Sequence, residues 1–189
     1  MKKIVIFASG QGSNAENIVI YFNKKGLASV VSIFTNNPSA KVLDIAKNNN
    51  VDSLVFNKTE LNDGFILDKL NDINPDLIVL AGFLWKFPEH IINAYANKVI
   101  NIHPALLPKF GGKGMFGMNV HQAVLNNNEI ETGITIHYVN KNYDEGAFVF
   151  QKAVSIADCD SAEAIARKIH ELEIENFPKV IAKILNLKS

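Results

Sequence analysis

The sequence predicts an α/β fold: a mostly parallel, twisted sheet with helices on both faces and an antiparallel hairpin towards the carboxyl terminus. Two observations carry this prediction. Short apolar runs alternate with amphipathic stretches up to residue 103, a pattern typical of repeated β-α-β units. Beyond that point, two β-rich runs flank a polar turn and a long amphipathic stretch follows, which indicates a hairpin and a terminal helix.

The first half of the chain supplies the parallel strands. Each expected strand is rich in Val, Ile, Leu or Phe, and each expected helix repeats its apolar residues three or four positions apart. The expected strands cover residues 3–8, 30–34, 53–56, 77–81 and 99–103. The expected helices cover residues 14–22, 39–47, 64–73 and 89–95, and the first of them is capped near Ser13 or Asn14. This order predicts a Rossmann-like sheet.

The second half begins with an expected helix over residues 118–125. Residues 133–139 and 147–154 are expected to form the hairpin, with residues 140–146 as its polar tip. Ser161 is expected to cap a helical stretch that reaches residue 187 and is interrupted or kinked at Pro178. The glycine-rich residues 111–117 lack a regular pattern and are expected to form the most mobile loop.

Size and composition favour one domain with a substantial core, since the chain has 189 residues and is 48% hydrophobic. Lys plus Arg and Asp plus Glu each number 19, so no basic field indicates a nucleic-acid partner. The single cysteine, Cys159, excludes an internal disulfide and fits a reducing cytoplasm. The apolar start is too short for a signal peptide, and no apolar run approaches the length that spans a bilayer.

The strongest chemical signal is the pair Asn101 and His103, which closes an expected buried strand. Residues two apart in an extended segment point to the same side, so the two side chains can meet one small substrate atom. A carboxamide next to an imidazole suits the stabilisation of an oxyanion and the movement of a proton. A buried polar pair that caps the sheet is the alternative. The carboxyl edge of a parallel sheet, where ligands collect, favours the functional interpretation.

A second signal is Ser-Gly-Gln-Gly-Ser-Asn at residues 9–14, between the first strand and the first helix. Glycines let the backbone approach a ligand, and a helix start offers free N–H groups to a phosphate. Residues 10–15 also satisfy a dinucleotide fingerprint, but residues 35–38 lack the acid that would hold an adenosine ribose. The pattern therefore favours a monophosphate over NAD; a plain tight turn is the alternative.

A third signal is Asp144 in the polar tip, whose carboxylate could hold the His103 ring, although an aspartate in a turn is often only a turn former. His121 is expected to line the site, and His137 is either a core residue or a pocket wall. His90 and His170 are expected on helix surfaces. The five histidines show no metal-binding spacing. The aromatic residues within 82–88 suit either core packing or a platform for a flat heteroaromatic ligand.

Together these motifs resemble the phosphoribosylglycinamide formyltransferases, a family of folate-dependent enzymes of purine synthesis within the formyltransferase superfamily. The motifs occur in the family's order over nearly the whole chain. The resemblance implies that 10-formyltetrahydrofolate donates a formyl group to the amine of 5-phosphoribosylglycinamide on the route to IMP. It implies one formyltransferase domain over residues 1–189, with a phosphate-binding half up to about residue 100 and a folate and catalytic half beyond it.

The resemblance also implies roles for individual residues. Asn101 and a protonated His103 stabilise the tetrahedral oxyanion, and Asp144 keeps that histidine cationic and assists proton transfer. Gly12, Ser13 and Asn14 hold the substrate phosphate, and Glu173 holds the ribose. The implied folate-binding residues are Leu84, Trp85, Lys86, Phe87, Asn101, Asn140 and Asp144. No metal is implied, because position and proton transfer activate both the amine and the leaving group.

The resemblance further implies a cytoplasmic enzyme of small molecules, monomeric or weakly dimeric, without nucleic-acid or membrane partners. A methionyl-tRNA formyltransferase would add a nucleic-acid-binding domain, and a formyltetrahydrofolate deformylase a regulatory domain; we expect neither in a chain of this length. Two alternatives remain open from the residues. One is the same chemistry on another small amine, such as a nucleotide-linked amino sugar. The other is an NAD-binding oxidoreductase or a nucleotide-sensing module that uses the glycine turn.

Overall fold

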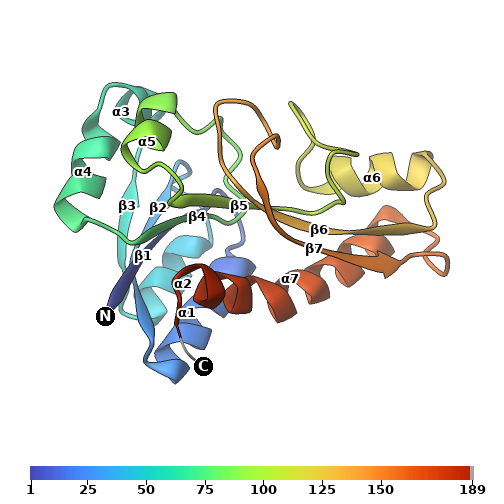
Figure 1. The fold of residues 1–189 in the computed structure, drawn as a ribbon, viewed down its shortest axis with the longest axis horizontal. Coiled ribbons are helices and arrows are strands. Elements are labelled where there is room, and N and C mark those ends of the chain that lie inside the picture. Colours follow the sequence, from blue (N-terminus) through green and yellow to red (C-terminus); the bar gives the residue numbers. More distant parts are fainter. Residues whose placement is uncertain (188–189) are drawn as a thin grey trace.

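A twisted, seven-stranded sheet forms the centre of the computed structural model, which describes residues 1–187 (Figure 1). The strand order is β3-β2-β1-β4-β5-β6-β7. The strands are β1 (Lys2–Phe7), β2 (Ala28–Thr35), β3 (Asp52–Val55), β4 (Leu77–Leu80), β5 (Val99–His103), β6 (Glu131–Tyr138) and β7 (Phe148–Ser155). Strands β1 to β5 pair in parallel, whereas β6 is antiparallel to β5 and β7 is antiparallel to β6. The predicted fold class is confirmed.

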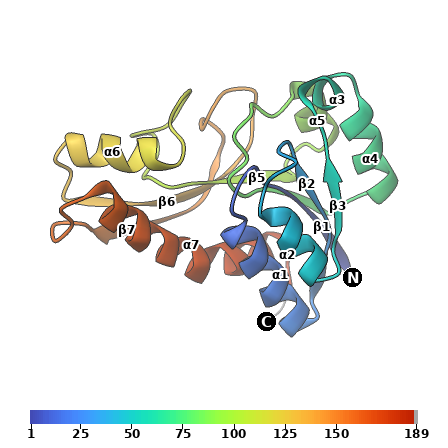
Figure 2. The ribbon, with the colours of Figure 1, turned by 180° about the vertical axis from the view of Figure 1, so that it is seen from behind.

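Helices cover both faces of the sheet (Figures 1 and 2). On one face lie α1 (Ser13–Lys25), α2 (Val42–Asn48) and α7 (Ala162–Ile184), and α6 (Met118–Asn126) packs beside α7. On the other face lie α3 (Lys58–Asn62), α4 (Phe65–Ile73) and α5 (Glu89–Ala94). Alternate residues of β1 feed two cores, because Ile4 and Ile6 face α1 and α7 while Val5 and Phe7 face α4 and α5.

Two helix starts differ from the sequence predictions. Gly12, and neither Ser13 nor Asn14, occupies the capping position of α1, with a φ of 80° and no side-chain cap. The short helix α3 was not expected, although its signal is in the sequence: Asn57 accepts hydrogen bonds from the N–H groups of Thr59 and Glu60, and the Glu60 carboxylate accepts one from the N–H of Asn57. This reciprocal capping stabilises a helix too short to show an apolar period.

The sequence predicted that the terminal helix is either interrupted or kinked at Pro178. The structure shows no interruption, because α7 runs through Pro178 as one helix. Ser161 caps it as expected, because its hydroxyl accepts a hydrogen bond from the N–H of Ala164. Proline cannot donate to the carbonyl four residues earlier, which belongs to Ile174. The side-chain amide of Asn17, on α1, donates to that carbonyl at 2.8 Å instead. A neighbouring helix thus replaces the missing bond.

Candidate active site

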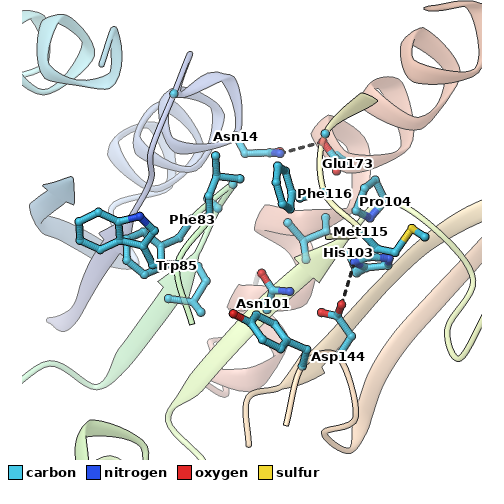
Figure 3. A pocket seen from close by; sticks show the side chains of 18 of the residues that line it. Asn14, Phe83, Trp85, Asn101, His103, Pro104, Met115, Phe116, Asp144 and Glu173 are labelled. Carbon is cyan, nitrogen blue, oxygen red and sulfur yellow. Dashed lines mark hydrogen bonds and ion pairs between the residues drawn. The ribbon is translucent and has the colours of Figure 1, made fainter. Parts of the chain in front are cut away.

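A cavity of about 600 Å³ opens at the carboxyl edge of the parallel strands, where open α/β sheets bind ligands. Its walls come from the turn after β1, the loops after β4 and β5, the tip between β6 and β7, and one face of α7. All residues that the sequence assigned to a site line this one cavity: Gly12, Ser13, Asn14, Leu84, Trp85, Lys86, Phe87, Asn101, His103, Asn140, Asp144 and Glu173. Residues far apart in the sequence therefore share one site (Figure 3).

Asn101 and His103 point into this cavity from the end of β5. The ring of His103 is buried, with 3% of the residue exposed. Its Nε2 lies 2.8 Å from the carbonyl oxygen of Phe110, and because a carbonyl only accepts, Nε2 carries the proton in the neutral ring. The Nδ1 atom then faces Asp144. Burial and this hydrogen bond fix the orientation of the ring.

Asp144 reaches the same point from the tip of the β6–β7 hairpin. Its Oδ2 lies 3.6 Å from the Nδ1 of His103 (Figure 3). The same oxygen accepts a hydrogen bond from the N–H of Gly112 at 2.9 Å. Its backbone is left-handed, with a φ of 56°, which an aspartate tolerates in a tight turn. A Cβ on Gly146 would lie 1.6 Å from the carbonyl oxygen of Tyr138, so only glycine lets the tip fold this closely onto β6.

His137 connects Asp144 with Asn101. The Nδ1 of His137 donates to the carbonyl of Tyr138 at 2.9 Å, which leaves Nε2 as an acceptor in the neutral ring. The amide Nδ2 of Asn101 lies 3.2 Å from this Nε2, and Oδ1 of Asp144 lies 3.6 Å from it. His137 is thus a pocket wall rather than a core residue alone. One Asn101 hydrogen is used here, and the second is available to a ligand.

Burial controls protonation in this group. Burial lowers the pKa of His103, and the negative charge of Asp144 and the Phe110 carbonyl offset it only in part. Burial alone would raise the pKa of Asp144, but His137, His103 and the Gly112 N–H outweigh it and lower the pKa. Desolvation of the ring therefore opposes the expected effect of Asp144 on His103 and favours the neutral ring in the free protein. That Asp144 keeps His103 cationic during catalysis stays a prediction.

The glycine turn forms the opposite end of the cavity. Gly12 has a left-handed backbone, and an added Cβ would lie 2.7 Å from Cγ2 of Val42, so glycine is required there. Asn14 donates from Nδ2 to Oε2 of Glu173 on α7 at 2.8 Å (Figure 3). The Oδ1 of Asn14 is buried and has no partner among the described residues. An amide oxygen of this kind needs a donor, which a ligand hydroxyl or amine could supply.

His170 is exposed on the surface of α7, as expected, and it also lines the cavity one turn before Glu173. Its Nδ1 lies 3.7 Å from Oε2 of Glu173, and this carboxylate raises the pKa of His170. The sequence carried a signal for this contact, because residues three positions apart on a helix, such as His170 and Glu173, are neighbours on its surface. His121 also lines the cavity, as expected; burial lowers its pKa, and its Nδ1 has no partner among residues 1–187.

The loop after β4 provides an aromatic wall. The rings of Phe83 and Trp85 pack edge to face, with their centroids 6.4 Å apart. The ring of Phe87 packs against that of Phe83 in the same way, with a centroid distance of 6.2 Å. Phe87 is 4% exposed and belongs to the core, whereas Leu84 is 47% exposed. The Nζ of Lys86 lies 5.9 Å from the centre of the Tyr143 ring, which connects this loop with the hairpin tip. Core packing is therefore confirmed for Phe87, whereas a platform for a flat ligand stays a prediction for this loop.

The glycine-rich residues 111–117 close the remaining side of the cavity, and Met115 and Phe116 line the cavity from there (Figure 3).

Among residues 1–187, no group of three or more His, Cys, Asp or Glu side chains is arranged to hold a metal ion. Within the same part of the chain, no helix combines the length and apolarity needed to cross a membrane.

A Rossmann-like sheet thus brings an amide, an imidazole and a carboxylate together at one end of a cavity, with a glycine turn at the other end, an arrangement that suits a transferase of small molecules. The formyl transferase family model matches residues 2–181, and the chain belongs to this family. It is 36% identical over 196 residues to phosphoribosylglycinamide formyltransferase of Bacillus subtilis. This match covers 100% of the chain and 97% of the relative. The predicted family is confirmed.

Further relatives and solved structures agree. The chain is 36% identical over 190 residues to the chloroplastic phosphoribosylglycinamide formyltransferase of Arabidopsis thaliana; the match covers 97% of this chain and 65% of that protein. The crystal structure of glycinamide ribonucleotide transformylase 1 from Geobacillus kaustophilus superposes with a TM-score of 0.89 at 34% identity, covering 98% of this chain and 99% of the other. The chain thus spans 65% of the plant relative and nearly all of these two bacterial proteins.

Proposed function

We propose that this protein transfers the formyl group of 10-formyltetrahydrofolate to the amine of 5-phosphoribosylglycinamide in the biosynthesis of IMP. One observation carries the proposal: a single cavity holds Asn101, His103 and Asp144 at one end and the turn of α1 with Glu173 at the other. A phosphoribosyl amine has the matching polarity, with an anion at one end and a nucleophile at the other. The family membership and the names of the bacterial relatives support this substrate.

Gly12, Ser13 and Asn14 would bind the phosphate through the first N–H groups of α1, where the helix dipole favours an anion. Glu173 would accept hydrogen bonds from the ribose hydroxyls. Its side chain is 13% exposed, and Asn14 holds it in place. The unpartnered Oδ1 of Asn14 supplies a further acceptor at the same point. The sugar phosphate would thus be held by groups that the free protein already orients.

At the other end, Asn101 would donate its free amide hydrogen to the negative charge that develops on the formyl oxygen. That charge also raises the affinity of the nearby His103 ring for a proton. We propose that His103 takes up, at Nδ1, the proton that the attacking amine loses, so that the ring is cationic only during the reaction, and that Asp144, 3.6 Å away, stabilises the cation. Asp144 would also orient a water that passes this same proton on to the leaving nitrogen, which returns His103 to its neutral form.

The folate would lie between the loop after β4 and the hairpin tip. The residues present fit a flat heteroaromatic group, because Trp85 is half-buried beside exposed Leu84, and Asn140 and Asp144 supply polar atoms on the facing wall. When bound, 10-formyltetrahydrofolate supplies the electrophilic formyl carbon and the leaving nitrogen. Lys86 lies at the edge of this wall, over the ring of Tyr143. We propose Leu84, Trp85, Lys86, Phe87 and Asn140 as folate-binding residues.

We further propose that the reaction takes place in the cytoplasm, with small molecules as partners and a monomer or weak homodimer as the working form. The single, half-buried and unpaired Cys159 supports a reducing compartment. Light scattering across a concentration series tests the oligomeric state directly.

A formyl-transfer assay that compares candidate amines tests the function. We expect turnover with glycinamide ribotide, and none of comparable efficiency with a nucleotide-linked amino sugar. Trp85 fluorescence, quenched by a folate but unchanged by NADH, gives an independent measure of the co-substrate. Transfer to the amino sugar alone, or binding of a nicotinamide cofactor without formyl transfer, would contradict the proposal.

A further inference from the structure

Three side chains form one row across the antiparallel part of the sheet. His103 on β5 lies directly opposite Thr135 on β6, and Thr135 lies directly opposite Gln151 on β7. Residues that face each other across paired strands project from the same side of the sheet. The row therefore begins at the proposed catalytic imidazole and ends at an edge strand outside the cavity.

The chain that leaves β5 crosses this row and binds to the Thr135 hydroxyl. Thr135 is fully buried. Its Oγ1 donates to the carbonyl of Ala105 at 2.7 Å and accepts from the N–H of Leu107 at 3.0 Å. A third bond comes from Gln151, at 2.9 Å. A hydroxyl has one hydrogen and two lone pairs, so every bond that Thr135 can make is used.

Gln151 completes the attachment from the outer strand. Although the residue is exposed, its Nε2 donates to both the carbonyl of Leu107 and the Thr135 hydroxyl, each at 2.9 Å. Both amide hydrogens are therefore engaged. Leu107 is held through its N–H by one side chain and through its carbonyl by the other, which fixes the orientation of its backbone.

The same loop returns to His103 three residues later. The carbonyl of Phe110, which has a left-handed backbone with a φ of 56°, accepts the Nε2 hydrogen of His103 at 2.8 Å. We propose that Thr135 and Gln151 are positioning residues: they hold the loop at Leu107 so that the Phe110 carbonyl fixes His103 in the Nε2–H tautomer. With the proton on Nε2, the Nδ1 lone pair faces Asp144 and can take up a proton there.

Other charged groups around His103 cannot supply this control. Asp144 and His137 face it from the hairpin, and His121 and Glu173 influence it from α6 and α7. The Asp144 carboxylate alone would favour a proton on Nδ1, which is the opposite tautomer. The Phe110 carbonyl therefore has to be held in place, and this part of the inference does not depend on the substrate.

The test measures the tautomer of His103 by ¹⁵N NMR of the ring in the free protein. We expect a single Nε2–H form in the wild-type protein and in Thr135→Ser, which keeps the hydroxyl. Thr135→Val has nearly the same shape without the hydroxyl, and Gln151→Met removes the donors at an exposed position. Both should show a mixture of tautomers. Lys152→Met on the same strand loses only an exposed ion pair with Glu175 and should behave as wild type.

The catalytic consequence rests on the proposed function. We expect kcat to fall about tenfold or more in Thr135→Val and Gln151→Met, with the two KM values changed by less than about threefold, because a misplaced catalytic group affects the transition state more than binding. Thr135→Ser should restore kcat. A single wild-type tautomer in both variants would overturn the inference, even if Thr135→Val lost stability. If the two variants show a mixture of tautomers but the wild-type protein does not formylate glycinamide ribotide, only the proposed function is overturned.

Discussion

The side chain of Asn101 is the proposed donor to the developing oxyanion. Replacement by alanine removes the amide and leaves its neighbour His137 without one hydrogen-bond partner. We expect Asn101→Ala to reduce kcat roughly 10²- to 10³-fold, as the loss of one oxyanion donor does elsewhere. His103→Ala should cost a comparable or larger factor. Steady-state kinetics at saturating substrates measures both.

The exposed Asn62 on α3, whose amide bonds a carbonyl of its own helix, provides a matched control far from the cavity. Asn62→Ala should retain wild-type kcat. Near-normal turnover in Asn101→Ala and His103→Ala would remove the catalytic assignment of the β5 end.

The Glu173 carboxylate lies at the other end of the cavity and has two expected effects. If it binds the ribose hydroxyls, Glu173→Gln should raise KM for the phosphoribosyl amine about 10- to 100-fold, the range for the loss of a charge-assisted hydrogen bond. The same change should lower the pKa of His170 towards 6.5, measured by NMR titration. Glu175→Gln, on the exposed side of α7, should change neither. An unchanged KM in Glu173→Gln would exclude ribose binding by this residue.

The start of α1 carries the proposed phosphate site. Gly12 and Gly26 flank this helix, and both are left-handed, with φ values of 80° and 65°. Alanine at Gly26 meets open space, so Gly26→Ala should cost only the left-handed strain of about 1–2 kcal/mol. Alanine at Gly12 would also press on Val42 and Ile45, which adds about 1–3 kcal/mol of overpacking. Urea unfolding compares the two variants, and equal losses would contradict this account of Gly12.

The contact between α1 and α7 at Pro178 can be tested as a pair. Asn17→Ala leaves the Ile174 carbonyl without a partner and should lower the free energy of unfolding by about 1–3 kcal/mol. In a Pro178→Ala background the restored N–H bonds that carbonyl, so the cost of Asn17→Ala should shrink. A double-mutant cycle by urea unfolding measures this coupling. Fully additive losses would show that Asn17 does not substitute for the missing helical bond.

At the scale of the whole molecule, buried histidines make stability depend on pH. Burial lowers the pKa of His103 and His121 below 6.5, so the unfolded chain binds more protons than the folded one just below that pH. Their contribution is present above pH 6.5 and is lost as the pH falls towards the folded pKa values. We expect a smaller free energy of unfolding at about pH 5.5 than at about pH 7.5, measured with urea.

Variants separate the contributing histidines. His121→Asn should weaken this pH dependence. His170 has the opposite sign, because its raised pKa stabilises the folded state at low pH, and His170→Asn should therefore steepen the dependence slightly. A pH dependence that is identical in His121→Asn and the wild-type protein would contradict the assignment.

The order of elements was predictable because the central parallel strands contain short apolar runs, such as Leu77–Leu80, bounded by polar turns. The pair Asn101 and His103 was predictable for the same reason, since it directly follows such a run. The helix α3 was missed because Asn57 and Glu60 cap only five residues, too few to repeat an apolar period. Local patterns thus predict the elements whose own residues decide their structure.

Contacts between distant segments were harder to predict. The uninterrupted course of α7 depends on Asn17, which lies on another helix, and the link from Asp144 through His137 to Asn101 depends on strand register. The resting protonation of His103 depends on how deeply the folded chain buries it. None of these can be derived from the spacing of residues along one segment.

The antiparallel strands β6 and β7, which follow β5, also have a consequence for the synthesis of the protein chain itself. Because Asp144 sits on the β6–β7 tip and Glu173 on α7, a nascent chain that has delivered only the parallel strands carries Asn101 and His103 without either carboxylate. If Glu173 binds the ribose as proposed, chains that terminate before α7 should bind a sugar phosphate only weakly. We therefore expect the proposed site to form only after α7 has been synthesised and has docked on the sheet.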